Sequence, residues 1–216
     1  MIQFINVAKE YNGHHALSNV SFSVKPGEMV FLTGHSGAGK STVLKLAMHI
    51  ESPSRGQIHI NHHNLSRLTK HHIPLLRGRI GMVYQNPQLL QNHTVFDNVA
   101  LPLVMSGYRH REMKRRVQAA LDKVGLLSKE KLFPAALSSG EQQRVGIARA
   151  VVNKPDILLA DEPTGNLDPE LSMEVLRLFS AFHAVGVTVL IATHDLSLVA
   201  QMSCPIITLQ NGETKQ

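Results

Sequence analysis

The sequence predicts an α/β fold built around a mainly parallel core sheet, and two features indicate it. Three segments are continuous apolar runs: "MVFLT" (29–33), "DILLAD" (156–161) and "VTVLIAT" (187–193). Runs of this kind are typical of strands that are covered on both faces in a parallel sheet. Each run is followed by a polar turn and a helical pattern, which is the alternation expected of an α/β protein.

The N-terminal part of the chain predicts a second, antiparallel β unit. Apolar and polar residues alternate in "IQFINV" (2–7) and "NVSFSV" (19–24), on either side of a turn at "YNGHH" (11–15). A further alternating segment, "GQIHI" (56–60), follows a breaker-rich stretch. Short alternating segments indicate half-exposed strands, so we expect an N-terminal antiparallel β subdomain.

The strand patterns stop in the middle of the chain. From about residue 87 to 137 helical patterns replace them, which predicts a helical subdomain inserted into one domain that spans residues 1–216. The tail "LQNGETKQ" (209–216) contains an Asn-Gly pair, which is a strong turn signal. We therefore expect the chain to end in a small hairpin.

Composition limits the function classes but does not choose one. The 216 residues are 43% hydrophobic, enough for one substantial core, and the formal net charge is +6. Nucleic acid, an acidic membrane face and a nucleotide polyphosphate are all compatible with this charge. The densest basic cluster, "YRHREMKRRVQ" (108–118), carries apolar residues at helical spacing. We interpret it as the solvated face of an amphipathic helix, in preference to a headgroup or nucleic-acid site.

Other classes of site are not supported by the sequence. No apolar run approaches the roughly 20 residues of a membrane span, and the N-terminus lacks a signal-peptide pattern, so a soluble protein is expected. The only cysteine, Cys204, is interpreted as packing in a reducing compartment. Adjacent histidines do not converge on one face, so no metal site is predicted at the three pairs, His14–His15, His62–His63 and His71–His72.

A phosphate-binding loop follows the first apolar run. "GHSGAGKS" (34–41) has the spacing of two glycines followed by Lys and Ser that lets backbone N–H groups surround a phosphate. Lys40 is expected to reach the β- and γ-phosphates, and Ser41 to bind Mg²⁺. The residues expected to bind the nucleotide here are Gly34, His35, Ser36, Gly37, Ala38, Gly39, Lys40, Ser41 and Thr42.

Two acids end the second apolar run, where ligands bind in open parallel sheets. Asp161 is predicted to hold Mg²⁺, and Glu162 to take a proton from an attacking water. A plain helix cap is the alternative reading of this pair, but the buried run before it argues against that. His194 ends the third run and is well placed to contact the γ-phosphate or the attacking water, although a histidine after a strand is often structural.

Two further segments complete the set of candidate site residues. Gln85, after the apolar "RIGMVY" (79–84), is either a surface amide or a contact to Mg²⁺ and water. "LSSGEQQRVGIARA" (137–150) is a Ser- and Gly-bearing turn that runs into a helix. Free N–H groups at such a helix start form an anion site, so the chain carries a second one besides the phosphate loop.

Taken in order, these motifs resemble those of the ATP-binding-cassette (ABC) ATPases, and the match covers the whole chain. The resemblance implies ATP hydrolysis with Mg²⁺ and a homodimer in which two chains enclose two ATP molecules head to tail. It implies that the signature residues Ser138, Ser139 and Gly140 of one chain face the nucleotide on the other chain's loop. It further implies that Tyr11 stacks on adenine and that Asp168 lies at the dimer seam.

One residue departs from the family pattern. The signature usually reads Leu-Ser-Gly-Gly, and this chain has Ser139 at the first glycine. If that position required a positive φ or a close backbone approach to phosphate, a side chain would cost about 1 kcal/mol or more. Either a weakened partner-facing site or an added hydroxyl donor would follow, and we expect retained but modest activity.

Within the family, several segments are similar to members that act in bacterial cell division and in the control of cell-wall hydrolases. That resemblance implies an integral membrane partner, contacted by the insertion around residues 85–103, on the cytoplasmic side of the inner membrane. An ATPase of the lipoprotein-releasing or macrolide-exporting kind is the nearest alternative. A cassette protein acting on DNA or ribosomes, and a nucleotide-binding scaffold without turnover, are the further readings.

Overall fold

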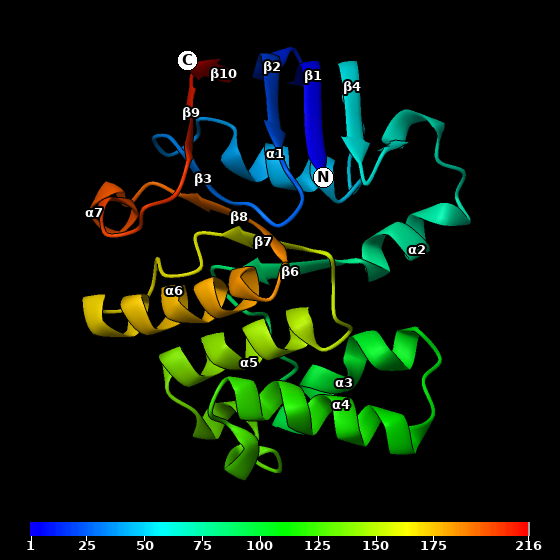
Figure 1. Cartoon of the computed structure of the whole chain (residues 1–216), viewed down its shortest axis with the longest axis vertical. Coiled ribbons are helices and arrows are strands. Elements are labelled where there is room, and N and C mark those ends of the chain that lie inside the picture. Colours follow the sequence, from blue (N-terminus) through cyan, green and yellow to red (C-terminus); the bar gives the residue numbers. More distant parts are fainter. Residues whose placement is uncertain (216) are drawn as a thin grey trace.

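The computed structural model describes residues 1–215, which form two β-sheets with helices between and beside them (Figure 1). The first sheet consists of β1 (Ile2–Tyr11), β2 (His14–Val24), β4 (Arg55–Ile60) and β5 (His63–Asn64), in the order β2-β1-β4-β5. The second consists of β3 (Met29–Thr33), β6 (Ile80–Tyr84), β7 (Ile157–Asp161), β8 (Thr188–Thr193), β9 (Ile206–Gln210) and β10 (Glu213–Lys215), in the order β10-β9-β3-β8-β7-β6.

The second sheet is the predicted parallel core. Strands β9, β3, β8, β7 and β6 all pair in parallel, and β10 adds an antiparallel edge strand. The three continuous apolar runs are β3, β7 and β8, as expected. The hairpin predicted from the Asn-Gly pair is β9–β10. Of the segment 209–216 for which the hairpin was predicted, Gln216 lies outside the described residues.

Apolar side chains cover both faces of this sheet, which explains the continuous runs. In β3, Val30 and Leu32 join a cluster with helix α1 (Lys40–Ala47) and the first sheet. The alternate residues Met29 and Phe31 join the opposite cluster, which contains the remaining long helices. Figure 1 shows α1 between the two sheets. The phosphate loop that begins α1 is therefore held from both sides by core packing.

The first sheet is antiparallel, as the alternating segments predict. Phe4 and Phe22 stand opposite each other in β1 and β2, and their rings stack with centroids 4.6 Å apart. The turn between these strands is Asn12–Gly13, and both residues have positive φ. This Asn-Gly pair fits the left-handed geometry of a two-residue hairpin turn.

Helices dominate the chain between β6 and β7. The helices after α1 are α2 (His72–Gly78), α3 (Val95–Met105), α4 (His110–Lys123), α5 (Ser139–Val151), α6 (Pro169–Ala184) and α7 (Leu196–Ala200). Short 3₁₀ turns lie at Leu65–Arg67, Leu127–Lys129 and Pro134–Ala136. Figure 1 shows α3 and α4 beside α5, farther from the core sheet than α5 and α6. We retain the limits 87 and 137 of a helical subdomain as a prediction.

Helix α4 confirms the amphipathic interpretation of the basic cluster. Its residues Val117 and Leu121 are fully buried in the helical core, and Met113 packs against it from the edge. Lys114 and Arg115 on the same helix are exposed. Among residues 1–215, no helix combines the length and the apolar character needed to cross a bilayer.

Candidate active site

The register of the core sheet brings four predicted motifs to one edge. Thr33 of β3 pairs with Thr193 of β8, and Asp161 of β7 pairs with both Ala192 of β8 and Tyr84 of β6. Four of these residues, Thr33, Thr193, Asp161 and Tyr84, end their strands, and the next residues are Gly34, His194, Glu162 and Gln85. Segments that are far apart in the sequence therefore meet at the carboxyl ends of parallel strands, where α/β proteins bind ligands.

The phosphate loop depends on glycine at two positions. Gly39, which caps α1, has φ of +104°, and an added Cβ would lie 2.7 Å from the carbonyl oxygen of Ala16 and 2.5 Å from Leu17. A Cβ on Gly34 would lie 2.4 Å from the carbonyl oxygen of Leu209. Neither position leaves room for a side chain, so the backbone itself lines the space that an anion would enter.

Lys40, Glu162 and His194 form a connected polar chain. Nζ of Lys40 lies 3.3 Å from Oε1 of Glu162, and Nδ1 of His194 lies 2.9 Å from the same oxygen. Lys40 also donates hydrogen bonds to the carbonyl oxygens of Gly34 at 2.8 Å and His35 at 3.2 Å. The Lys40 side chain is only 7% exposed, whereas that of His194 is 61% exposed. A base, a cation and an accessible imidazole thus meet at the phosphate loop.

Glu162 has an unusual backbone conformation. Its φ is +47°, in the left-handed region that costs a residue with a side chain about 1 kcal/mol or more. Its N–H donates to the carbonyl of Ala192 at 2.9 Å, and its Oε2 accepts from the backbone N–H of His194 at 3.3 Å. The conformation directs the carboxylate along the strand ends toward Lys40 and His194. Asp161 and Glu162 are therefore not a helix cap, and the plain alternative for this pair is wrong.

Asp161 has the features of a metal ligand. Its Oδ1 is buried and has no hydrogen-bond partner among the described residues. Burial raises the pKa of this carboxyl above its ordinary value, and the nearby Ser41 hydroxyl acts in the opposite direction. A carboxylate oxygen and a hydroxyl are the hard donors that Mg²⁺ prefers. The residues present therefore fit the predicted Mg²⁺.

Gln85 lies at the same edge but contacts a different segment. Its amide nitrogen is 3.4 Å from Oδ1 of Asn166, and a Cβ on Gly165 would lie 2.7 Å from this nitrogen. Gln85 is exposed, and no hydrogen bond joins it to Asp161 within residues 1–215. Its role as a contact to Mg²⁺ and water stays a prediction.

Tyr11 is held beside α1 by a cluster that sequence reasoning missed. Its hydroxyl donates a short hydrogen bond to Glu51, and Nζ of Lys9 lies 4.8 Å from the ring centroid. Glu51 also pairs with Lys9 at 3.4 Å and with Lys45 of α1 at 3.8 Å. Burial and the Glu51 contact raise the pKa of the Tyr11 phenol, against a smaller opposite effect of Thr42. No motif or spacing marks Glu51 in the sequence.

The signature turn forms a well-capped helix start. The Ser138 hydroxyl accepts from the N–H of Glu141 at 3.3 Å, and the Glu141 carboxylate accepts from the N–H of Ser138 at 3.1 Å. Lys129 forms an ion pair with Glu141. The contact with Lys129 lowers the pKa of Glu141 below its ordinary value, and the hydrogen bond from the Ser138 N–H lowers it further by a smaller amount. Within residues 1–215, no hydrogen bond joins 138–140 to the phosphate loop.

Ser139 does not occupy a position that requires glycine. It is the first residue of α5 and is absent from the residues with positive φ, so the possible strain does not arise. The next residue, Gly140, has an ordinary φ, but a Cβ there would lie 3.0 Å from Leu171 of α6. Ser138 and Ser139 are exposed, whereas Gly140 is buried. The tight space in this turn is therefore at Gly140, where a side chain would have to displace the methyl groups of Leu171.

Asp168 caps the neighbouring helix. Its carboxylate accepts from the N–H of Leu171 at 3.0 Å, and its side chain is exposed. Because Leu171 packs on Gly140 and Arg144 pairs with Glu174 at 2.7 Å, α5 and α6 lie against each other near their starts. The signature turn and Asp168 are thus brought to one surface, separate from the Lys40 loop.

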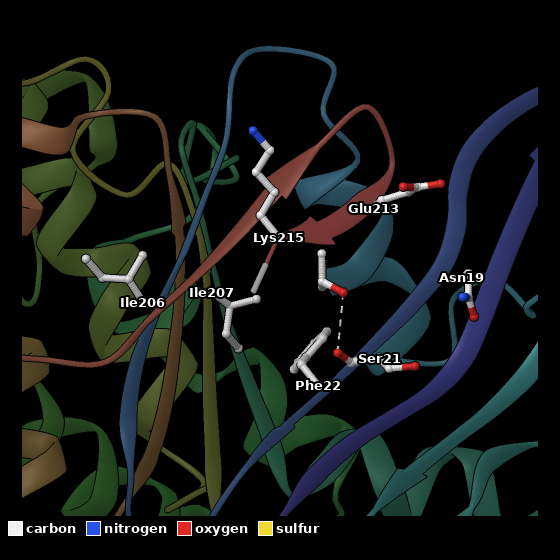
Figure 2. Close-up of a pocket in the computed structure, with 8 residues that line it drawn as sticks. Asn19, Ser21, Phe22, Ile206, Ile207, Glu213 and Lys215 are labelled. Atoms are coloured by element: carbon white, nitrogen blue, oxygen red, sulfur yellow. Dashed lines mark hydrogen bonds between the residues drawn. The ribbon is translucent and has the colours of Figure 1, made fainter.

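A hollow of about 430 Å³ lies elsewhere on the molecule, between β2 and the β9–β10 hairpin. Figure 2 shows Ser21 and Phe22 on one side of it and Ile207 and Lys215 on the other. None of the predicted site residues lines this hollow. The predicted chemistry therefore belongs to the strand-end site and not to this hollow.

Comparisons with known proteins agree with this geometry. The chain is 58% identical to the cell division ATP-binding protein FtsE of Escherichia coli (strain K12) over 98% of this chain and 96% of that protein. It is 46% identical to the protein of the same name from Bacillus subtilis (strain 168), over 98% of this chain and 93% of that one.

Solved structures show the same architecture. The dimeric ATP-binding cassette MJ0796, in a post-hydrolysis state bound to ADP and Pi, superposes with a TM-score of 0.90 at 34% identity. That match covers 100% of this chain and 97% of the cassette. A family model described as "ABC transporter" matches residues 17–165. This chain therefore belongs to the ABC transporter family and is an ATPase of the ATP-binding-cassette type.

Proposed function

We propose that this chain is the ATP-hydrolysing subunit of a membrane ABC complex that acts in bacterial cell division and controls cell-wall hydrolases. Its relatives from Escherichia coli and Bacillus subtilis are both named cell division ATP-binding proteins, and they match it over nearly their whole length. The observation that carries the proposal at the atomic level is the meeting of Lys40, Glu162 and His194 beside the phosphate loop.

Each of these residues has a proposed role in hydrolysis. Lys40 leaves the loop carbonyls and binds the β- and γ-phosphates. Glu162 then accepts a proton from the attacking water, and His194 positions that carboxylate and contacts the γ-phosphate. Mg²⁺, held by Ser41, Asp161 and Gln85, would neutralise the charge that develops on the phosphate oxygens.

We further propose that two copies enclose two ATP molecules. The helix start at Ser138–Gly140 presents free N–H groups that no part of its own phosphate loop uses. Asp168 lies on the same surface, as a residue of the dimer seam would. The similar cassette bound to ADP and Pi is dimeric, which supports this arrangement. Hydrolysis and phosphate release remove the shared anion, so the pair opens.

The membrane partner is proposed to resemble FtsX. It would contact the insertion around residues 85–103, where Leu90 is 41% exposed. Val104 and Met105, directly after this segment, are 58% and 88% exposed. Exposed apolar side chains at one end of α3 are suited to receiving a helix of a partner. The chain would then sit on the cytoplasmic face of the bacterial inner membrane.

The test of the catalytic assignment is Glu162→Gln. Loss of the base is expected to lower the rate of phosphate release by about 10²- to 10⁴-fold while ATP binding is retained. Glu170→Gln, a change of the same kind at an exposed position of α6, serves as the control and should hydrolyse ATP normally. Equal phosphate release by Glu162→Gln and the parent protein would refute the role of Glu162.

The membrane assignment needs a separate measurement. Membranes from cells that contain the FtsX-like protein should retain the ATPase after washing, and membranes from cells that lack it should not. Retention in both preparations would contradict the pairing. This experiment is independent of catalysis, so it can be performed with Glu162→Gln as well as with the parent protein.

A further inference from the structure

One stretch of this chain carries basic residues without any acid. Between Glu51 and Asp97 there is no Asp or Glu, and there are five Lys and Arg residues: Arg55, Arg67, Lys70, Arg77 and Arg79. The whole chain has a net charge of only +6. Six histidines lie in the same stretch. The catalytic site uses only Gln85 of this stretch, so the charge is not explained by ATP.

The structure folds part of this stretch around a hollow of about 380 Å³. Leu68, Leu75 and Leu76 provide an apolar lining. Leu76 is 7% exposed, whereas Leu75 is 67% exposed although it belongs to α2. Leu75 and the hollow beside it therefore form one apolar surface against which an apolar side chain of a partner would pack.

Two arginines and a histidine from separate segments border the hollow. Arg67 comes from a 3₁₀ turn, His72 from α2, and Arg79 from the residue before β6. Asp156, which lies outside the acid-free stretch, pairs with Arg79 at 2.6 Å and accepts from Asn61 at 3.4 Å. Within residues 1–215, Arg67 has no carboxylate partner. The border therefore keeps an excess of positive charge.

This hollow is separate from the ATP site. Arg79 immediately precedes Ile80, the first residue of β6, and Gln85 follows the last residue of the same strand. The hollow thus lies at the amino end of a parallel strand, and the catalytic residues lie at the carboxyl ends. In Figure 1, α2 stands at the side of the core sheet near β6, away from α5 and α6.

We propose that this hollow is a docking site for an acidic segment of a partner protein. One apolar side chain of the segment would lie against Leu68, Leu75 and Leu76, and a flanking carboxylate would bind Arg67, since Arg79 is already paired with Asp156. The concave shape favours a peptide over a bilayer, because a flat surface would not reach the recessed Leu76. Charge complementarity selects acidic segments, since the stretch contains no acid and Asp156, which lies outside it, pairs with Arg79 and leaves Arg67 unbalanced.

A binding assay with the full-length chain tests this proposal. The probe is a short fluorescein-labelled peptide with one central leucine flanked by aspartates and glutamates, measured by fluorescence anisotropy at low ionic strength. Arg67→Glu should weaken binding at least about tenfold, and salt should weaken it further. The matched control is Arg115→Glu, the same charge change at an exposed arginine of α4, which should bind like the parent. ATP hydrolysis should be unchanged in both variants.

The apolar contact is tested by two further changes. Replacing the leucine of the peptide by serine, and Leu75→Ser in the protein, should each weaken binding severalfold. The proposal is overturned if the peptide does not bind, if the serine peptide binds as well as the leucine peptide, or if Arg67→Glu and Arg115→Glu weaken binding equally. It is also overturned if Arg67→Glu leaves peptide binding unchanged but abolishes binding to phosphatidylglycerol vesicles, which would identify a membrane contact instead.

Discussion

Asp161 combines two properties that conflict in the isolated fold. It is an acid with a buried oxygen that has no hydrogen-bond partner, and burial raises the pKa of its carboxyl. A raised pKa in the folded state means that the ionised form opposes folding. The stability is greatest when the carboxyl is protonated and falls as the pH rises through the raised value. The ionised form of Asp161 therefore carries an unfavourable charge that a bound cation would neutralise.

Asp161→Asn should reveal this cost. Without Mg²⁺, the substitution is expected to raise the free energy of unfolding by about 1 kcal/mol, because the buried oxygen without a partner no longer carries a charge. With Mg²⁺ and ATP, the variant should lose most of the increase in Tm that the parent gains. Thermal denaturation in EDTA and in Mg-ATP measures both effects, with Asp122→Asn on exposed α4 as control. A less stable variant with a full Mg-ATP response would contradict the assignment.

Ser139 allows a second test at this scale. Because it has helical backbone geometry at the start of α5, glycine would gain nothing from its freedom there. Ser139→Gly is expected to lower the free energy of unfolding by about 0.5 kcal/mol or less, since glycine loses more entropy in a helix. Urea denaturation decides the sign. A more stable glycine variant would mean that Ser139 is strained after all.

Residue roles that depend on local spacing were predictable, and those that depend on distant contacts were not. The order of glycines, Lys40 and Ser41 is a local pattern, so the loop could be identified before the fold. Glu51 acts on Tyr11 from 40 positions away, and no pattern connects them. The left-handed φ of Glu162 is equally invisible, because an acid after a strand gives no sign of it.

Among the elements, α5 has the clearest dependence on its first turn. Ser138 and Glu141 form a reciprocal capping box, and Lys129 adds an ion pair to the same carboxylate. The charge of Glu141 also interacts favourably with the positive end of the helix. Because α5 presents the signature turn, the protonation of one side chain affects the geometry of the proposed partner-facing site.

The stability of α5 should therefore depend on acid. The pKa of Glu141 is lowered in the fold from 4.5, so its contribution is complete above that value and is lost as the pH falls through the lower folded value. Glu141→Gln should cost about 1 kcal/mol near neutral pH, and this difference should vanish at low pH. Urea unfolding at several pH values measures it, with Glu213→Gln, at an exposed position of β10, as control. A difference that does not change with pH would contradict the role of the charge.

The strands and helices were largely predictable from the sequence, but which of them lie next to one another was not. Strands β3, β7 and β8 were expected because both of their faces are buried and no polar residue interrupts the runs. The order of these strands in the sheet could not be predicted, because pairing between strands that are far apart in the sequence leaves no periodic pattern in it. Helix α2 was also missed, because its seven residues contain Pro74 and give too short a pattern.

At the scale of the whole molecule, the two anion sites lie on separate parts of one chain. The phosphate loop is fixed between two sheets by α1, and the signature turn is fixed by the contact of Gly140 with Leu171. Both are preformed, and no hydrogen bond within residues 1–215 connects them. The phosphate loop and the signature turn of one chain therefore do not bind the same ATP. The loop of one chain and the turn of a second chain can bind one ATP between them, so that ATP links the two chains.

Crosslinking tests this arrangement directly. Two single-cysteine variants are made in a Cys204→Ser, Glu162→Gln background, so that ATP persists: one with Ser36→Cys in the phosphate loop and one with Ser139→Cys. Position 139 is preferred to 138 because the Ser138 hydroxyl caps α5. In mixtures of the two, mild oxidation should give a disulfide-linked pair only when Mg-ATP is present, because the nucleotide brings the two positions together.

The control replaces Ser139→Cys by Arg115→Cys, which is exposed on α4 and outside the proposed seam. This second mixture should crosslink no more with Mg-ATP than without it. Size-exclusion chromatography of the first mixture should show an ATP-dependent dimer before oxidation. If the Ser36–Ser139 mixture stays monomeric and uncrosslinked at saturating Mg-ATP, each chain must complete its site in another way, and the proposed shared nucleotide is wrong.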